Sequence, residues 1–169
     1  AMIGANIAPG MNREFTAEAW KHLLPMKGWY DAVTEANDLI CNDVEMRIQG
    51  HHIDGEVIKV AMANAREAGV DHLIHFQQRP VSELSHPKKY GFVITNPPYG
   101  ERLLEKKEAG ELYRVFGRAM AQMPPKWRIV ILSSHTEFER CFGRNAEKKR
   151  KLYNGMLKCD AFFYGGKEK

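Results

Sequence analysis

The strongest constraint on how this chain can fold is a short stretch, FVITNPPYGER, at residues 92–102. Four strand-forming residues lead into Asn96, and two consecutive prolines follow it. Proline has a fixed φ and no N–H group, so neither a helix nor a strand ladder can continue through this pair. The chain must therefore leave a buried strand abruptly and stiffly at Asn96.

Strand-like and helix-like segments alternate along the rest of the chain, up to a final Asn154-Gly155 pair that lies between two strand-like runs and predicts a β-hairpin. The alternation predicts an α/β fold with an open, mostly parallel sheet, helices on both faces and a closing antiparallel hairpin. The continuous apolar run at 128–134 predicts a strand that is buried on both faces. The expected helices cover residues 16–24, a second piece up to about 41, 55–68, 108–123 and 136–142, and the expected strands cover 47–52, 72–77, 90–95, 128–134 and the hairpin at 151–157.

Composition places the chain among ordinary globular proteins. It has 169 residues, of which 44% are hydrophobic and 27% charged, so we expect one domain spanning 1–169. No apolar run has the ~18 residues that a membrane span needs, and no signal peptide is visible. Three scattered cysteines without a CxxC motif predict reduced thiols and a cytoplasmic protein, and the net charge of +4 permits an anionic partner. Met2 is either a translation start or an internal residue of a longer protein.

Two other chemistries are not supported by the sequence. His51, His52 and Asp54 resemble part of a metal site, but no second cluster completes it and adjacent strand residues point to opposite faces. We therefore expect no metal. The string Ser133-Ser134-His135 lacks the glycines of a nucleophile elbow, which argues against a hydrolase.

The residues after the strand suit the methylation of an exocyclic amine on a nucleobase, a weak nucleophile because its lone pair is delocalised into the ring. The Asn96 side chain and the Pro97 carbonyl can both accept hydrogen bonds from the amine, and Pro98 holds the Pro97 backbone still. Tyr99 can stack on a base swung out of its strand, and Gly100 permits close approach. This is catalysis by fixed hydrogen-bond acceptors. The competing interpretation is a rigid turn with a packed tyrosine.

The segment resembles the [DNS]-P-P-[YFW] signature of class I, S-adenosylmethionine-dependent amino-methyltransferases. Together with ANIAPGMNREF, HIDGEVIKVAMANAREAGV and the closing KLYNGMLKC, it is similar to the THUMP-associated, RlmL-like RNA methylases over essentially the whole chain. This resemblance implies a Rossmann-like sheet, S-adenosyl-L-methionine as cofactor, and methyl transfer to N2 of a guanine in 23S ribosomal RNA. NPPY alone would also fit DNA and protein-glutamine methylases.

The sequence departs from this family on the cofactor side. The glycine-rich loop of the form DPxCGSGT, and the first strand before it, have no counterpart in these 169 residues. The family's acidic ribose ligand is replaced by His52, while Asp54 is better placed to cap a helix. An acidic residue near position 80 is also absent, and Gln78 or Glu83 could substitute for it. We expect His52, Asp54, Gln78 and Asn96 to line the cofactor side, with weak or no cofactor binding by this chain.

The expected RNA contacts are Tyr99, Gly100, Arg102, Lys149 and Arg150. An incoming strand must pass the NPPY tetrapeptide at 96–99, and the basic run at 148–151 could contact its phosphates. For the basic run, a solvated charged face is the alternative. Two further interpretations stay open: a non-catalytic RNA-binding remnant, and a DNA adenine-N6 methylase. A sheet without its first strand would expose two edges, which predicts self-association.

Overall fold

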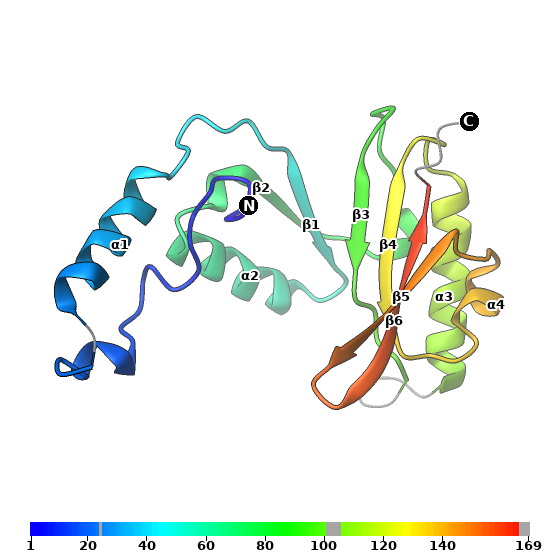
Figure 1. Cartoon of the computed structure of the whole chain (residues 1–169). Coiled ribbons are helices and arrows are strands. Elements are labelled where there is room, and N and C mark those ends of the chain that lie inside the picture. The colour runs from blue at the N-terminus through cyan, green and yellow to red at the C-terminus, as the bar shows by residue number, and fades with distance from the viewer. Residues whose placement is uncertain (24, 101–105, 166–169) are drawn as a thin grey trace. The chain divides into compact units, whose positions relative to one another are not determined.

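The computed structural model describes residues 1–23, 25–100 and 106–165 (Figure 1). The chain divides into two compact units, Ala1–Arg79 and Pro80–Lys169. Arg102, one of the expected RNA contacts, lies outside the described residues.

The first unit contains a parallel pair of strands and their connecting helix. β1 (Ile48–His52) and β2 (Ile74–Gln78) pair in register from Ile48 with Ile74 to His52 with Gln78. Between them runs α2 (Gly55–Glu67), which begins where the Asp54 carboxylate accepts a hydrogen bond from the Glu56 N–H at 2.8 Å, as the sequence predicts. A 3₁₀ turn (Thr16–Ala19), α1 (Met26–Asp38) and a second 3₁₀ turn (Asp71–Leu73) complete the unit.

The second unit is a four-stranded mixed sheet in the order β3-β4-β6-β5. β3 and β4 are parallel, whereas β6 is antiparallel to both β4 and β5. Together with the parallel β1–β2 pair, this mixed sheet confirms an α/β fold with parallel strands and helices that closes with an antiparallel hairpin. The elements, in chain order, are a 3₁₀ turn (Val81–Glu83), β3 (Phe92–Thr95), α3 (Lys106–Ala121), β4 (Arg128–Ser133), α4 (Phe138–Phe142), β5 (Lys148–Asn154) and β6 (Leu157–Tyr164).

The core of this second unit lies on one face of its sheet, where both α3 and α4 pack (Figure 1). β4 buries Ile129, Ile131 and Ser133 on this face, while the residues between them are less buried. The prediction that β4 is buried on both faces is therefore wrong for the described structure. Phe92 and Ile94 of β3, at 66% and 77% exposed, lie on the face without helices.

Two further predictions need correction. The helix expected at 16–24 is a single 3₁₀ turn, Thr16–Ala19, because Trp20 leaves the helical region with ψ 54. The hairpin turn is displaced by one residue: Asn154 still pairs with Leu157, and the two loop residues are Gly155 and Met156. Gly155 has φ 62, and glycine at the first loop position is one of the two favoured two-residue hairpin geometries.

Each sheet ends in a strand with an unpaired edge among the described residues. Among the described residues, β1 pairs only with β2, and β3 has β4 as its one partner. Self-association through these edges stays a prediction.

Candidate active site

The NPPY residues lie at the carboxyl end of β3. Asn96 directly follows Thr95, the last residue of the strand, and its side chain is exposed. Ligands of open α/β sheets bind at this edge, outside the carboxyl ends of the strands. The Asn96 amide is therefore accessible at the edge where a substrate would bind.

Tyr99 lies against Asn96 and is half-buried. Its hydroxyl donates a hydrogen bond to Asn96 Oδ1. An amide oxygen has two lone pairs, so Oδ1 keeps one for a further donor. Burial raises the pKa of Tyr99, while hydrogen bonding by the neighbouring Asn154 lowers it and contact with Cys159 raises it further. The tyrosine thus stays protonated at neutral pH and can act as the donor that orients the Asn96 side chain.

The second proline is fixed by a residue that the sequence analysis did not identify. Tyr113 of α3, which is completely buried, donates its hydroxyl to the Pro98 carbonyl at 2.6 Å. The same hydroxyl lies 3.1 Å from Ser133 Oγ at the end of β4. Burial raises the pKa of Tyr113. Within the described residues, no group donates to the Pro97 carbonyl, which is consistent with the acceptor role predicted for it.

Gly100 ends the motif with φ 87, a left-handed conformation that favours glycine over any residue with a side chain. The backbone conformation of the turn after Tyr99 therefore favours glycine at this position, independently of any contact with substrate. The close approach of substrate that the sequence predicts for Gly100 stays a prediction.

Three of the four cofactor candidates meet at the carboxyl ends of β1 and β2 in the first unit. His52 Nδ1 accepts the Asp54 N–H at 3.0 Å, and Gln78 Nε2 donates to the Ile53 carbonyl at 2.9 Å. A Cβ atom added at Gly55 would lie 2.8 Å from Gln78 Oε1, so this turn is closely packed. All three side chains are also exposed. The fourth candidate, Asn96, belongs to the second unit, and Glu83 lies in a 3₁₀ turn of that unit.

The two predicted RNA contacts in the basic run occupy opposite faces of the fully exposed strand β5. Lys149 forms an ion pair with Glu139 of α4 at 2.7 Å, and this contact raises the pKa of the lysine. Arg150 is opposite Ala161 of β6 and is exposed. Lys149 is therefore partly neutralised by its partner.

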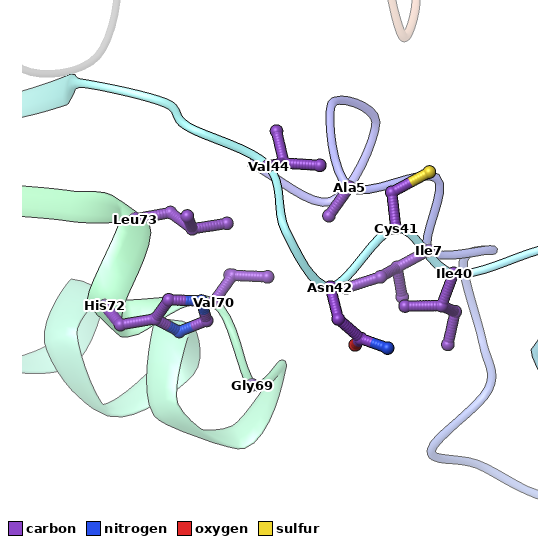
Figure 2. A pocket seen from close by; sticks show the side chains of 10 residues that line it. All are labelled: Ala5, Ile7, Ile40, Cys41, Asn42, Val44, Gly69, Val70, His72 and Leu73. Atoms are coloured by element: carbon purple, nitrogen blue, oxygen red, sulfur yellow. The ribbon is translucent and has the colours of Figure 1, made fainter.

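The hollows of the described structure include one in each unit. One, of about 60 Å³, lies in the first unit and is mostly apolar, with residues of the amino-terminal segment, the 40–44 segment and the α2–β2 connection around it (Figure 2). The other, of about 250 Å³, lies in the second unit beyond the carboxyl end of β4. The first is too small for a nucleobase.

The described ranges contain no helix long and apolar enough to cross a membrane. Nor do those residues bring three or more His, Cys, Asp or Glu side chains together as metal ligands would require.

The amino-acid sequence of this chain matches a family of methyltransferase domains and several of its relatives. Residues 1–162 match the family described as "UPF0020: RMKL-like, methyltransferase domain". YpsC of Bacillus subtilis (strain 168), provisionally named an RNA methyltransferase, is 39% identical over 99% of this chain and 43% of its own length. A ribosomal RNA large subunit methyltransferase K/L from Shewanella sp. (strain W3-18-1) is 34% identical over 94% of this chain and 23% of its own.

Solved structures agree with these relatives. A possible methylase from Clostridium difficile 630 superposes with a TM-score of 0.92 at 43% identity, over 99% of this chain and 44% of that chain. A protein provisionally named a methyltransferase and complexed with SAH has a TM-score of 0.91 at 39% identity, with coverage of 99% and 44%. The chain thus spans less than half the length of these relatives. The family match extends over both units, and the chain belongs to the RMKL-like methyltransferase domain family.

Proposed function

We propose that this chain is part of an S-adenosylmethionine-dependent RNA methyltransferase that modifies an exocyclic amine of a base, with N2 of a guanine in 23S ribosomal RNA as the target. The observation that carries the proposal is the exposed Asn96 amide, oriented by Tyr99 at the carboxyl end of β3. The relatives named as RNA and ribosomal RNA methyltransferases support an RNA substrate. A cytoplasmic location, as predicted from the sequence, would give the protein access to ribosomal RNA.

In this reaction the chain holds the target amine in position. Asn96 Oδ1 and the Pro97 carbonyl each accept one N–H of the amine, which leaves its lone pair free to meet the methyl group of the cofactor. The hydrogen bond from Tyr113 to the Pro98 carbonyl holds the backbone of the NPPY segment in place when the amine binds. The nitrogen would gain the methyl group as the bond between that carbon and the positively charged sulfur breaks, with the sulfur keeping the electron pair. The nitrogen would then lose one proton to water beside the exposed Asn96 side chain.

S-adenosylmethionine supplies a methyl group on a positively charged sulfur. The residues at the ends of β1 and β2 fit part of this cofactor. With Nδ1 of His52 accepting a backbone N–H, Nε2 would be left to donate to a ribose hydroxyl. Asp54 uses Oδ1 for the helix cap and has a second carboxylate oxygen as an acceptor. Gln78 would face the adenine.

Calorimetry and a transfer assay together test this function. Micromolar binding of S-adenosylmethionine, and methyl transfer to deproteinised 23S ribosomal RNA in preference to duplex DNA, are the expected results for the full-length protein that contains this chain. Preference for duplex DNA would contradict the RNA assignment and favour the DNA adenine-N6 methylase. RNA binding without cofactor binding would favour the non-catalytic remnant, which the missing glycine-rich loop suggests as the second candidate.

A further inference from the structure

The hollow in the second unit is the larger of the two described above. It lies between the loop after β4 and one face of the β5–β6 hairpin. Its volume is about 250 Å³, and its wall is mostly polar or charged. None of the residues that line it belongs to the NPPY motif. The lining residues are Ser134, His135 and Thr136 of the loop, Glu139 of α4, Lys149 of β5, and Lys158, Asp160 and Phe162 of β6.

This pocket opens at the same edge of the sheet as Asn96. β3 and β4 are parallel neighbours, with Thr95 opposite Ile131, so the segments that follow them leave the sheet at one edge. Tyr113 connects the two places directly: its hydroxyl bonds the Pro98 carbonyl, and its ring packs edge-to-face on His135, with the centroids 5.3 Å apart. At the hairpin tip, Asn154 lies beside the Tyr99 hydroxyl. Asn154 faces away from the pocket side of the hairpin, so a strand that delivers a base to Asn96 would cross the hairpin tip to reach the pocket.

The charges around the pocket are suited to a phosphate at its rim. Alternation along the hairpin places Lys151 and Lys158 on the face that carries Lys149 and Asp160. Lys149 is occupied by Glu139, but no described acidic side chain lies within ion-pair distance of Lys151 or Lys158. Both are exposed, and they are the cations available to an incoming phosphate.

The inner wall offers hydrogen-bonding groups suited to a base. Asp160 provides an acceptor for base N–H groups, and Thr136 provides an exposed hydroxyl. Ser134 Oγ and His135 Nε2 are buried and have no hydrogen-bond partner among the described residues. Buried polar atoms without a partner are uncommon and indicate a place that a ligand or water completes. Above the rim, Tyr153 is 72% exposed and lies opposite Lys158, where its ring can stack on a further base.

We propose that this pocket binds the nucleotide next to the methylated one in the RNA strand, with its phosphate on Lys151 and Lys158 and its base against Asp160. The inference rests on the proposed function, because it takes single-stranded RNA as the substrate. It extends that function by assigning a second nucleotide site. It also assigns different roles within the basic run, because only the lysines on the pocket face of the hairpin would contact this nucleotide.

The first test measures binding of a fluorescein-labelled, single-stranded RNA of about twelve nucleotides to the 169-residue chain by anisotropy. Replacing Lys151 and Lys158 with glutamine should raise Kd about tenfold at 0.15 M salt and reduce the slope of log K against log salt by about 1.4, since each phosphate contact on a single strand contributes about 0.7. The matched control replaces Lys88 and Lys126 with glutamine, two exposed lysines near the amino ends of β3 and β4, and should change Kd less than twofold. Equal effects of the two pairs would overturn the inference.

A second variant separates base recognition from simple attraction of a polyanion. Asp160→Asn removes a negative charge, so general electrostatics predicts tighter RNA binding, whereas conversion of one carboxylate acceptor into an NH2 donor that faces the base N–H groups predicts binding weaker by about fivefold or more. Tyr153→Ala should also weaken binding about fivefold, and Tyr153→Phe, which keeps the ring, should not. Tighter binding by Asp160→Asn would overturn the nucleotide site. The proposed function is tested separately by methyl transfer. A protein that transfers methyl groups but binds RNA more tightly as Asp160→Asn would therefore contradict the nucleotide site alone.

Discussion

The Tyr113 hydroxyl, on α3, donates a hydrogen bond to the Pro98 carbonyl at 2.6 Å and thereby ties the NPPY segment to the core of the second unit. Tyr113 packs edge-to-face on Phe138, with ring centroids 4.8 Å apart, so its position is set by helix packing. The two prolines restrict the backbone of the motif, and the hydrogen bond from Tyr113 of α3 also fixes its position.

Tyr113→Phe is expected to slow methyl transfer about tenfold while leaving the affinity for RNA unchanged. The ring still fills its site, but the Pro98 carbonyl loses its donor, and the free energy of unfolding should fall by about 1–2 kcal/mol. Single-turnover transfer and urea denaturation measure the two effects. Tyr30→Phe, at a tyrosine that is 62% exposed, is the control and should alter neither. Equal transfer rates for wild type and Tyr113→Phe would contradict the anchoring role.

Tyr99→Phe tests the orientation of Asn96 separately from stacking. The variant keeps the ring but removes the hydrogen bond to Asn96 Oδ1, so transfer should slow about tenfold with little change in Kd for RNA. Tyr99→Ala removes both contributions and should raise Kd as well. If Tyr99→Phe and Tyr99→Ala behaved alike in both assays, the hydroxyl would have no separate role.

The Glu139 carboxylate predicts a pH-dependent contribution to stability. Burial raises its pKa, but hydrogen bonds from Lys149 and from the Ala146 N–H, both at 2.7 Å, outweigh burial and leave the pKa below its ordinary value of 4.5. Because the pKa is lower in the folded state, the stabilisation is fully present above 4.5 and disappears as the pH falls through the folded value. Glu139→Gln should therefore lower the free energy of unfolding by about 1 kcal/mol at pH 7 and by progressively less as the pH falls below 4.5. A difference between variant and wild type that stays constant over this range would contradict it.

Two glycines in helices should respond in opposite directions to alanine. A Cβ at Gly117 of α3 would lie 2.0 Å from the Phe142 carbonyl oxygen, so Gly117→Ala forces α3 and α4 apart and should cost about 1–3 kcal/mol. At Gly28 of α1 the nearest atom would be Pro25 Cγ at 3.8 Å, and Gly28→Ala should stabilise by about 0.5–1 kcal/mol. Thermal denaturation of both variants checks this pair. A neutral Gly117→Ala would show that the two helices are not in close contact there.

The features predicted correctly from sequence are those with local causes. Asp54 caps α2 two residues before the N–H that it binds, Asn96 follows its strand directly, and the hairpin depends on a glycine at its turn. Tyr113 was missed because its role depends on Pro98, fifteen residues away, and in the sequence it reads as one more apolar position of an amphipathic helix.

The same limit explains the incorrect predictions. An apolar run such as that of β4 predicts burial, but which of its faces is covered depends on elements far away in the chain. Likewise, the contact of Tyr99 with Asn154 and Cys159 joins segments more than fifty residues apart, and no periodicity indicates it. The cofactor roles of His52, Asp54 and Gln78 stay predictions.

The central claim is that Asn96 accepts a hydrogen bond from the target amine during transfer, and its most direct test is the single-turnover rate of Asn96→Ala in the full-length protein, measured together with its affinity for RNA. The expected result is a rate lower by on the order of 10²-fold with Kd for RNA within twofold of wild type, as for loss of one preorganised hydrogen bond in an active site. An unchanged rate at equal RNA affinity would contradict the claim.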